Sequence, residues 1–357
     1  MLLEQRICSR VHGAIILENT VLEYFEHTSY DKSFYEDYLN SRLPASVVDA
    51  HVHLCLKEHT SNVPDEVKAE DWAVEAGPYM SYEDLISYKK ELFPNQSFHY
   101  VGFPWPLYDA DTEANNSYIS KLISDNKILG LLTIRPEYDN EYIEQLYCEG
   151  GFSGFKPYPY MANTAKGADI SIFDFIPHKQ FELANKLKSP VLIHLPRANR
   201  LPDKDNIKEL RVILNNYPNV KPVVAHYGRC FNIEHLETAI KELGSDIHRL
   251  WFDTAAVLNP AVHRLALEKL DYKKILFGTD LPIMLWHGKR RWERGTYINL
   301  CRENFTWNKH LDKENEESYT FFIYEQLKCM LDAIGENEEI KNAIFYDNAI
   351  SVYGKGE

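Results

Sequence analysis

A chain of 357 residues with 45% hydrophobic and 26% charged residues has the composition of a folded globular protein, of one large domain or two ordinary ones, and not of a disordered one. Its formal net charge of −14 argues against a sequence-independent grip on nucleic acid, because such binding needs clustered lysine and arginine. No apolar run approaches the roughly 18 residues of a membrane span, so we expect no membrane association.

The cysteines and the first residues indicate the compartment. Six cysteines are scattered without C-x-x-C pairs, so we expect neither a zinc ribbon nor a disulfide framework. Glu4 and Arg6 interrupt the first apolar stretch and no convincing cleavage site follows, so we expect no signal peptide. The natural location of such a chain is the cytoplasm.

The first 43 residues are predicted to be helical. Apolar residues three and four apart recur in ILENTVLEYFEH and again around Phe34, Tyr35, Tyr38 and Leu39. We expect residues 1–44 to form a helical extension packed on the outside of a main body at 45–357.

From Pro44 onward, short apolar runs rich in β-branched and aromatic residues alternate with longer charged segments of helical character. Such alternation is typical of βα units and a parallel sheet. The eight predicted strands are residues 47–53, 98–105, 128–136, 152–159, 190–196, 221–228, 249–256 and 274–280.

The number and spacing of these runs predict an α/β fold of the (β/α)8 TIM-barrel type. An open doubly wound sheet is the competitor, although no G-x-G-x-x-G follows the first strand, which counts against a dinucleotide-binding sheet. Two connections, 54–95 after strand one and 282–319 after strand eight, are too long for simple linkers and carry many aromatic residues. Such loops are either functional lids or packing against the N-terminal helices.

Two histidines stand at the end of the first strand, in VVDAHVHL. Side chains alternate along a strand, so His51 and His53 point to the same side and their imidazoles can reach one metal ion. A lone H-x-H is a weak motif, and two ordinary strand-end histidines would explain it equally well.

Other strands also end in ionisable side chains. Lys156 lies on the fourth strand, His194 on the fifth, His226 on the sixth and Asp280 on the eighth. Singly, each has a structural explanation: a buried histidine bonded to its own loop, an aspartate capping a turn, a solvated lysine. Strand ends converge on one mouth of a barrel, however, so jointly these residues favour a metal site there.

Together these motifs resemble the amidohydrolase superfamily, in particular its amidohydrolase-2 branch of metal-dependent TIM barrels. The resemblance covers about residues 45–355 and rests on D-x-H-x-H, the His of strand five, H-Y-G, F-G-T-D-L-P and the closing IFYDNAISVYG. It implies that a divalent metal, commonly zinc, is bound by His51, His53, His194 and Asp280. His226 is then either a residue that touches the substrate or, in two-metal members, a further ligand.

The implied chemistry is coherent. Neutral imidazoles with one carboxylate suit Zn²⁺ and leave a position open for water, whose pKa the metal lowers towards ~7. Asp280 would act as general base and His226 would polarise the scissile carbonyl or stabilise the oxyanion. Lys156 is either unmodified, with one metal ion, or carboxylated, with two. We favour one ion, and an unmodified ammonium would attract an anionic substrate.

Basic residues near the predicted mouth suggest the substrate. Guanidinium groups recognise carboxylate or phosphate by paired hydrogen bonds, although charge runs are often merely solvated. We therefore predict a small, carboxylate-bearing substrate, with these candidate binding residues: Arg197, Arg229, His287, Arg291 and Arg294.

The predicted activity is hydrolysis of a C–N or C–O bond in an amide, lactone or ester. The first alternative is a metal-dependent non-oxidative decarboxylase of the same fold. Many such lyases resemble E-x-H-x-H, whereas this chain has Asp49 at that position, which favours hydrolysis modestly. A catalytically silent metal-binding barrel is the further alternative. Oligomeric state is left open, a homo-oligomer included.

Overall fold

The computed structural model describes residues 25–70, 72–77, 79–162, 169–293, 296–308 and 310–354. Most of the predicted N-terminal helical segment falls on residues 1–24, outside this part. Within the described residues, the extension contains α1 (Ser29–Tyr35), followed directly by one π-helical turn, Glu36–Asn40. Thr28 and Asp31 start α1 as a capping box, each side chain bonding to the backbone N–H of the other residue.

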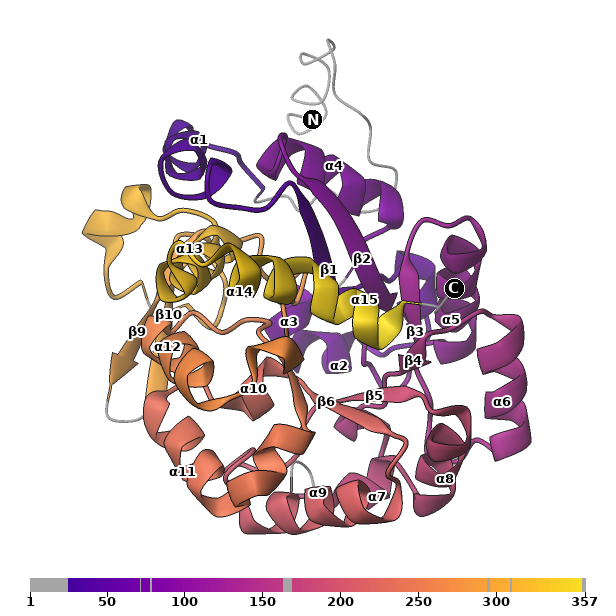
Figure 1. Cartoon of the computed structure of the whole chain (residues 1–357). Helices are drawn as coiled ribbons and strands as arrows, with labels where there is room; N and C mark the ends of the chain where they lie inside the picture. The colour runs from indigo at the N-terminus through magenta and orange to yellow at the C-terminus, as the bar shows by residue number, and fades with distance from the viewer. Residues whose placement is uncertain are drawn as a thin grey trace, which may run out of the picture.

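All eight predicted strands are present, parallel and in sequential order, which confirms the TIM barrel (Figure 1). Backbone hydrogen bonds of 2.9 Å join the last strand to the first, from Ala50 N–H to Phe277 O and from Asp280 N–H to His51 O. The strands are β1 (Ser46–His53), β2 (Ser97–Phe103), β3 (Leu129–Leu132), β4 (Gly154–Phe155), β5 (Pro190–Ile193), β6 (Lys221–Val224), β7 (Trp251–Asp253) and β8 (Ile275–Leu276).

The strands are short and apolar because a parallel barrel buries both of their faces, and every residue of β1 after Ser46 is buried. Helices surround them in a ring (Figure 1). Those that follow the strands are α4 (Tyr82–Leu92), α5 (Thr112–Ser124), α6 (Asn140–Glu149), α8 (His178–Leu187), α9 (Lys204–Asn216), α11 (Ile233–Leu243), α12 (Pro260–Lys269) and α13 (Phe322–Ile334).

Many of these helices begin at a side-chain cap that the sequence supplies. Asp203 accepts from the N–H of Asp205 and Asn206 at the start of α9, and Ser81 accepts from Asp84 N–H at the start of α4. Additional helical segments are α2 (Asp65–Glu70), α3 (Trp72–Glu75), α7 (Ile172–Phe175), α10 (His226–Arg229), α14 (Glu338–Asn342) and α15 (Asn348–Tyr353).

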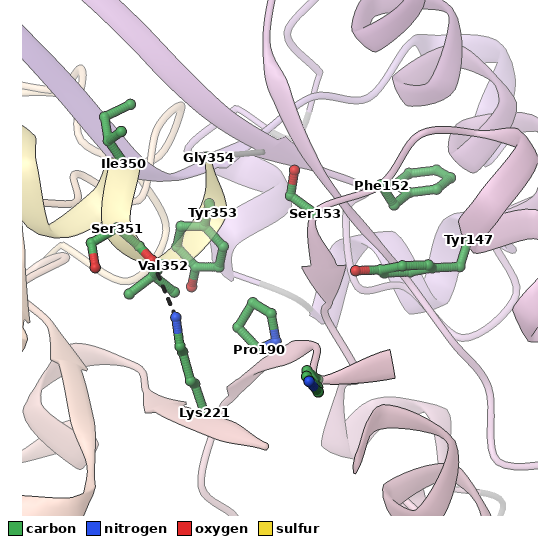
Figure 2. Close-up of a pocket in the computed structure, with 11 residues that line it drawn as sticks. Tyr147, Phe152, Ser153, Pro190, Lys221, Ile350, Ser351, Val352, Tyr353 and Gly354 are labelled. Carbon is green, nitrogen blue, oxygen red and sulfur yellow. Dashed lines mark hydrogen bonds between the residues drawn. The ribbon is translucent and has the colours of Figure 1, made fainter. Parts of the chain in front are cut away.

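The last helix closes one end of the barrel. Ala349, Val352 and Tyr353 of α15 pack with barrel residues such as Val48 and Leu192 in one buried cluster, and Figure 1 shows α15 lying across that end. Beside it is a hollow of about 800 Å³, shown in Figure 2, which Pro190 and Lys221 line from the first residues of β5 and β6.

This hollow lies at the amino ends of the strands. Among the described residues that line it there is no histidine and no acidic residue, and Lys221 Nζ already donates to Ser351 O at 3.1 Å. Catalytic groups of such barrels lie at the carboxyl ends of the strands. Despite its size, the hollow is therefore not the candidate active site.

The long segment after β8 forms a hairpin that the sequence did not predict. β9 (Gly288–Glu293) pairs antiparallel with β10 (Thr296–Cys301), and Arg290 stands opposite Asn299. In Figure 1 the hairpin lies at the edge of the molecule near α12.

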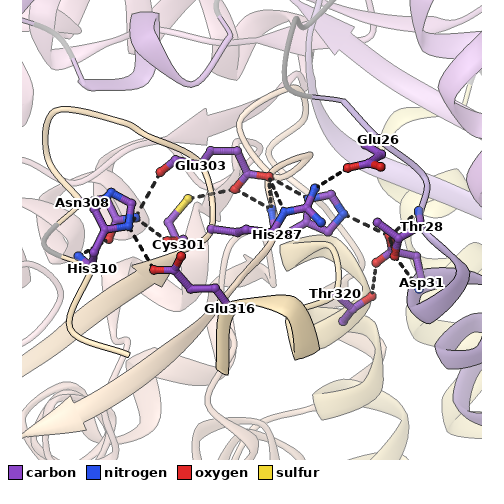
Figure 3. Close-up of polar contacts among 11 residues, drawn as sticks. Glu26, Thr28, Asp31, His287, Cys301, Glu303, Asn308, His310, Glu316 and Thr320 are labelled. Carbon is purple, nitrogen blue, oxygen red and sulfur yellow. Dashed lines mark hydrogen bonds and ion pairs between the residues drawn. The ribbon is translucent and has the colours of Figure 1, made fainter. Parts of the chain in front are cut away.

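A buried histidine joins this segment to α1 (Figure 3). The imidazole of His287 donates from Nε2 to Asp31 at 3.0 Å and from Nδ1 to Glu303 at 2.7 Å. Burial lowers the pKa of His287, but the hydrogen bonds and charges of Asp31 and Glu303 raise it above its ordinary value. Two carboxylates on either side of one ring therefore hold it as an imidazolium.

In the described part of the chain, no helix is long and apolar enough to cross a membrane. The described cysteines, at positions 55, 148, 230, 301 and 329, are all free thiols.

Gly278→Ala tests how closely β8 approaches β1. A Cβ at Gly278 would lie 2.8 Å from Cβ of His51, which is fixed to the backbone, so the strand or the imidazole has to shift. We expect a loss of about 1–3 kcal/mol in unfolding free energy together with loss of bound metal. In the control, Gly102→Ala, the new Cβ meets only the ends of Leu54 and Ile128, so metal content should be unchanged. Full metal content in Gly278→Ala would contradict this account.

His287→Gln removes the cation between two buried carboxylates and should lower the unfolding free energy by about 3 kcal/mol. Because the folded-state pKa of His287 is raised above its ordinary 6.5, its stabilisation is complete below about pH 6.5 and is lost as pH rises through the folded-state pKa. Denaturant unfolding at several pH values should show that the difference in unfolding free energy between wild type and His287→Gln is largest at the lowest pH.

A suitable control is His310→Gln, because His310 forms a partly exposed ion pair with Glu316. This change should cost less than about 1 kcal/mol. The difference in unfolding free energy between wild type and His287→Gln could instead stay constant with pH. That result would show that the imidazolium does not stabilise this contact.

Candidate metal centre

Three potential metal ligands meet at the carboxyl end of the barrel. Ligand atoms of His51, His226 and Asp280 all lie within 4.8 Å of one another, and all three residues are buried. Asp280 Oδ1 is 3.3 Å from His51 Nε2 and 3.1 Å from His53 Nε2. Two ligand atoms on a tetrahedral ion with bonds of about 2.1 Å are about 3.4 Å apart, so this spacing fits a single cation.

The buried carboxylate of Asp253, at the end of β7, orients two of the histidines. Its Oδ2 accepts from His51 Nδ1 at 2.8 Å, and its Oδ1 accepts from the backbone N–H of His226 at 2.7 Å. A ligating histidine commonly gives its second ring nitrogen to a carboxylate, which fixes the tautomer and the ring plane. Asp253 therefore leaves Nε2 of His51 facing Asp280.

His53 and His226 are fixed in the same sense by carbonyl groups. Nδ1 of His226 donates to Ala255 O at 2.8 Å. Nδ1 of His53 lies 3.4 Å from Pro104 O and 3.3 Å from the hydroxyl of Tyr158, which itself donates to Pro104 O at 2.7 Å. A carbonyl only accepts, so each Nδ1 carries the proton and each neutral ring presents Nε2 as an acceptor.

Burial sets the protonation of these rings. It lowers the pKa of His53 to about 4, holds that of His194 well below its ordinary value, and lowers that of His226. They are neutral at pH 7, the form that binds metal. Burial also acts against charge on His51, but Asp253 and Asp280 together raise its pKa to about 9.

Asp280 is ionised in this surrounding. Burial alone would raise its pKa, but the three imidazoles of His226, His51 and His53 hold it well below the ordinary value. The backbone is strained here too: φ is positive at His226 (58°) and Asp280 (75°). Non-glycine residues adopt such angles only where surrounding structure enforces them, which often marks a functional site.

Lys156 reaches the same place from the end of β4. Its side chain is buried, and Nζ lies 4.6 Å from the centre of the Tyr158 ring and 5.3 Å from that of Phe103. No hydrogen bond or ion pair of Nζ occurs within the described residues. Burial lowers its pKa to about 8, although Asp253 and Asp280 oppose the change.

Two adjoining cavities open from the cluster. The inner one, of about 120 Å³, is lined by His51, His53 and Lys156, and the outer one, of about 390 Å³, by Arg229 and Arg290. The two share these lining residues: Trp72, Tyr160, His194, His226, Asp280 and Ile283. All six residues predicted at the strand ends therefore line one connected space.

The ligand set itself stays a prediction. With one metal ion, the favoured case, the resemblance assigns His194 to the metal and His226 to the substrate, and only with two ions is His226 a further ligand, whereas the closest group of ligand atoms among the described residues contains His226. His194 lines both cavities, with its ring centre 5.4 Å from that of His226.

Of the predicted substrate-binding residues that the structure describes, only Arg229 lines these cavities. Arg197 forms a bidentate ion pair with Glu209 at 2.8 and 3.1 Å, His287 lies between Asp31 and Glu303, and Arg291 is an exposed residue of β9. Arg294 lies outside the described residues.

Sequence reasoning did not assign three residues that the structure places here. Asp253 ends the seventh strand in an apolar run, so the signal that found the histidines could have found it. Arg290 belongs to the same basic run as Arg291 and Arg294, but only the hairpin shows that strand alternation turns Arg290 and not Arg291 towards the cavity. Asn299 could have been found only by predicting the hairpin.

The fold and the cluster define a TIM-barrel protein with a candidate divalent-metal centre at the mouth. Residues 48–355 match the family model described as amidohydrolase. The chain belongs to the amidohydrolase family, a family of enzymes whose members bind divalent metal, and the predicted resemblance is confirmed.

Solved structures agree with the fold. The chain is similar to a probable 2-pyrone-4,6-dicarboxylic acid hydrolase from Acinetobacter baumannii (15% identity, TM-score 0.54) and to a 2,6-dihydroxybenzoate decarboxylase from Rhizobium (12%, 0.54). It is also similar to 5-carboxyvanillate decarboxylase from Sphingomonas paucimobilis (11%, 0.51). Each likeness covers 87% of this chain and 99% of the other. Hydrolases and decarboxylases both occur among these structures, so the fold does not fix the reaction. No curated protein matches this sequence.

Elemental analysis of purified protein should give one equivalent of divalent metal, zinc by prediction. His51→Ala and Asp280→Ala should lose it, because each removes a donor that faces the other. His99→Ala, an exposed histidine on β2, is the control and should keep the metal. Retention in both site variants would contradict a metal centre at this position.

The same measurement separates the two ligand sets. The resemblance predicts loss of metal in His194→Ala and retention in His226→Ala. The opposite result would give the ligand role to His226, as the distances within the closest group favour.

Proposed function

We propose that this protein is a metal-dependent hydrolase that cleaves a C–N or C–O bond in an amide, lactone or ester of a small anionic substrate. The observation that carries the proposal is the cluster of acceptor Nε2 atoms and the ionised Asp280 beside cavities whose other charged groups are cationic. A cytoplasmic location is part of the proposal.

The residues present fit a divalent cation. The imidazoles of His53 and His194 are neutral, and His51 would lose a proton on binding the cation, so that with the single facing carboxylate of Asp280 they form a donor set that zinc takes. The second ring nitrogens of His51 and His53 are occupied by Asp253 and by the carbonyl of Pro104. His51, His53, His194 and Asp280 would hold the ion, which would act as a Lewis acid and bring the pKa of a nearby water towards ~7.

His226 has a different role here from the predicted one. An oxyanion donor needs a proton on Nε2, but Nδ1 already carries the proton that is donated to Ala255 O. We therefore give His226 the role of taking the proton from the attacking water at Nε2. Asp280, held as a carboxylate by the imidazoles around it, orients that water, and His226 gives the proton it has taken to the leaving group.

Decarboxylation is the second candidate, and Lys156 is the observation that favours it. A buried ammonium without a carboxylate partner, in the inner cavity next to the cluster, is suited to hold a carboxylate at the reacting position. Asp49 does not decide between the reactions, since its oxygens bond to the hydroxyl and N–H of Thr279.

The products separate these candidates. Metal-loaded protein should release a new carboxylate with an amine or alcohol from at least one member of a panel of carboxylate-bearing lactones, amides and esters. His226→Ala should keep its metal and lose about 10²–10⁴-fold in kcat. Release of CO₂ from an aromatic acid panel, without hydrolysis, would make the decarboxylase correct. If the protein binds zinc but forms neither product, the catalytically silent metal-binding barrel would be the remaining alternative.

A further inference from the structure

Two arginine side chains lie over one aromatic ring that lines the outer cavity, and a third arginine lies next to them. The guanidinium carbons of Arg200 and Arg290 lie 5.1 and 5.2 Å from the centre of the Phe231 ring. Arg229 lies next to them, since its backbone carbonyl accepts from Arg200 Nη1 at 3.2 Å. Cations over an aromatic face are attracted to it, so Phe231 offsets part of their repulsion.

None of the three forms an ion pair with a carboxylate within the described residues. Burial lowers the pKa of Arg290 to about 10, and burial followed by the charge of Arg200 lowers that of Arg229. A desolvated guanidinium without a counter-ion is unfavourable, in contrast to Arg197, which is neutralised by Glu209. An anionic ligand would therefore supply the counter-ion that these three arginines lack within the described residues.

Two hydrogen bonds hold the guanidinium of Arg290 in place and use only some of its N–H groups. Nε donates to Asn299 Oδ1 at 2.9 Å across the hairpin, and Nη1 donates to Ala256 O at 2.7 Å. The ring of Tyr297 packs 4.2 Å from its guanidinium carbon. A guanidinium has five N–H groups, so three have no acceptor among the residues that the structure describes, and Arg290 lines the outer cavity.

The two arginines of the outer cavity lie at a defined position relative to the candidate metal ligands. The outer cavity containing Arg229 and Arg290 shares His194, His226 and Asp280 with the inner cavity, which contains Lys156. A molecule whose reacting bond lies at the cluster can therefore extend one end towards the two arginines.

We propose that Arg290, oriented by Asn299 and assisted by Arg229, is a specificity-determining residue that binds a substrate carboxylate remote from the reacting bond. The substrate class is thus a compound with a carboxylate beyond the group that reacts. This assignment rests on the proposed function for the reacting bond, but the binding itself does not require turnover.

The test is equilibrium binding by calorimetry to full-length, metal-loaded protein, with isophthalate as the dicarboxylate probe and benzoate as the monocarboxylate. We expect isophthalate to bind wild type at least about 10-fold more tightly than benzoate, because a second charge-assisted fork forms. Arg290→Gln should abolish that preference without changing the affinity for benzoate. Asn299→Ala should reduce it by about 3-fold, as expected of a positioning residue.

Arg291→Gln is the matched control, because Arg291 is the next residue of β9 and is exposed. It should leave both affinities unchanged. The proposal is overturned by the absence of a wild-type preference, by an equal loss for both probes in Arg290→Gln, or by loss of the preference in Arg291→Gln. Tighter binding of 3-phosphonobenzoate than of isophthalate would assign the site to a phosphate group instead.

Metal content and circular dichroism of each variant exclude misfolding as the cause. Failure of this inference is distinguishable from failure of the proposed function. An Arg290-dependent preference in a protein without hydrolase activity would reject only the function, and hydrolysis with no effect of Arg290→Gln would reject only the inference.

Discussion

The arrangement of the barrel mouth depends on one buried carboxylate, that of Asp253. It bonds to the ring of His51 through one oxygen and to the backbone of His226 through the other, so that residues from β1 and the end of β6 are held by the end of β7. Because the carboxylate is fully buried, its charge has to be matched, and His51 and His226 lower its pKa against the effect of burial. The orientation of His51 Nε2 towards Asp280 follows from this contact, whereas the ring of His226 is oriented by the carbonyl of Ala255.

Charge is distributed unevenly between the surface and the mouth. The chain carries a net charge of −14, yet Arg229, Arg290 and Lys156 line the cavities, and Asp280 is the acidic residue that lines both. The low dielectric of the barrel interior makes each of these charges act more strongly than it would at the surface. The cavities at the mouth therefore carry more positive charge than the net charge of the chain indicates.

The long segment after β8 gives this barrel its individual character. It supplies the hairpin that carries Arg290 and Asn299, and it is attached to α1 through the imidazole of His287. The segment after β1 also meets it, since Thr306 donates to Glu75 and the rings of Trp72 and Trp307 lie 6.0 Å apart. Both segments line the outer cavity through these two tryptophans. The loops therefore build the substrate-facing wall, while the strands carry the candidate metal ligands.

The sequence by itself determined the barrel and the residues at its strand ends. Eight short apolar runs, each followed by a helical segment, favoured a closed parallel barrel over an open sheet, so His51, His194, His226 and Asp280 could be placed at one mouth by counting strands. Only the tertiary structure decided which neighbours those side chains meet. Arg197 and His287 looked like substrate ligands but pair with Glu209 of α9 and with Asp31 of α1, whereas Arg290 is turned inward by the pairing of β9 with β10. The tautomer of His226 likewise depends on a carbonyl 29 residues away. Periodicity along the chain encodes which residues are buried, but pairing between distant polar groups is set by three-dimensional packing, which no local pattern records.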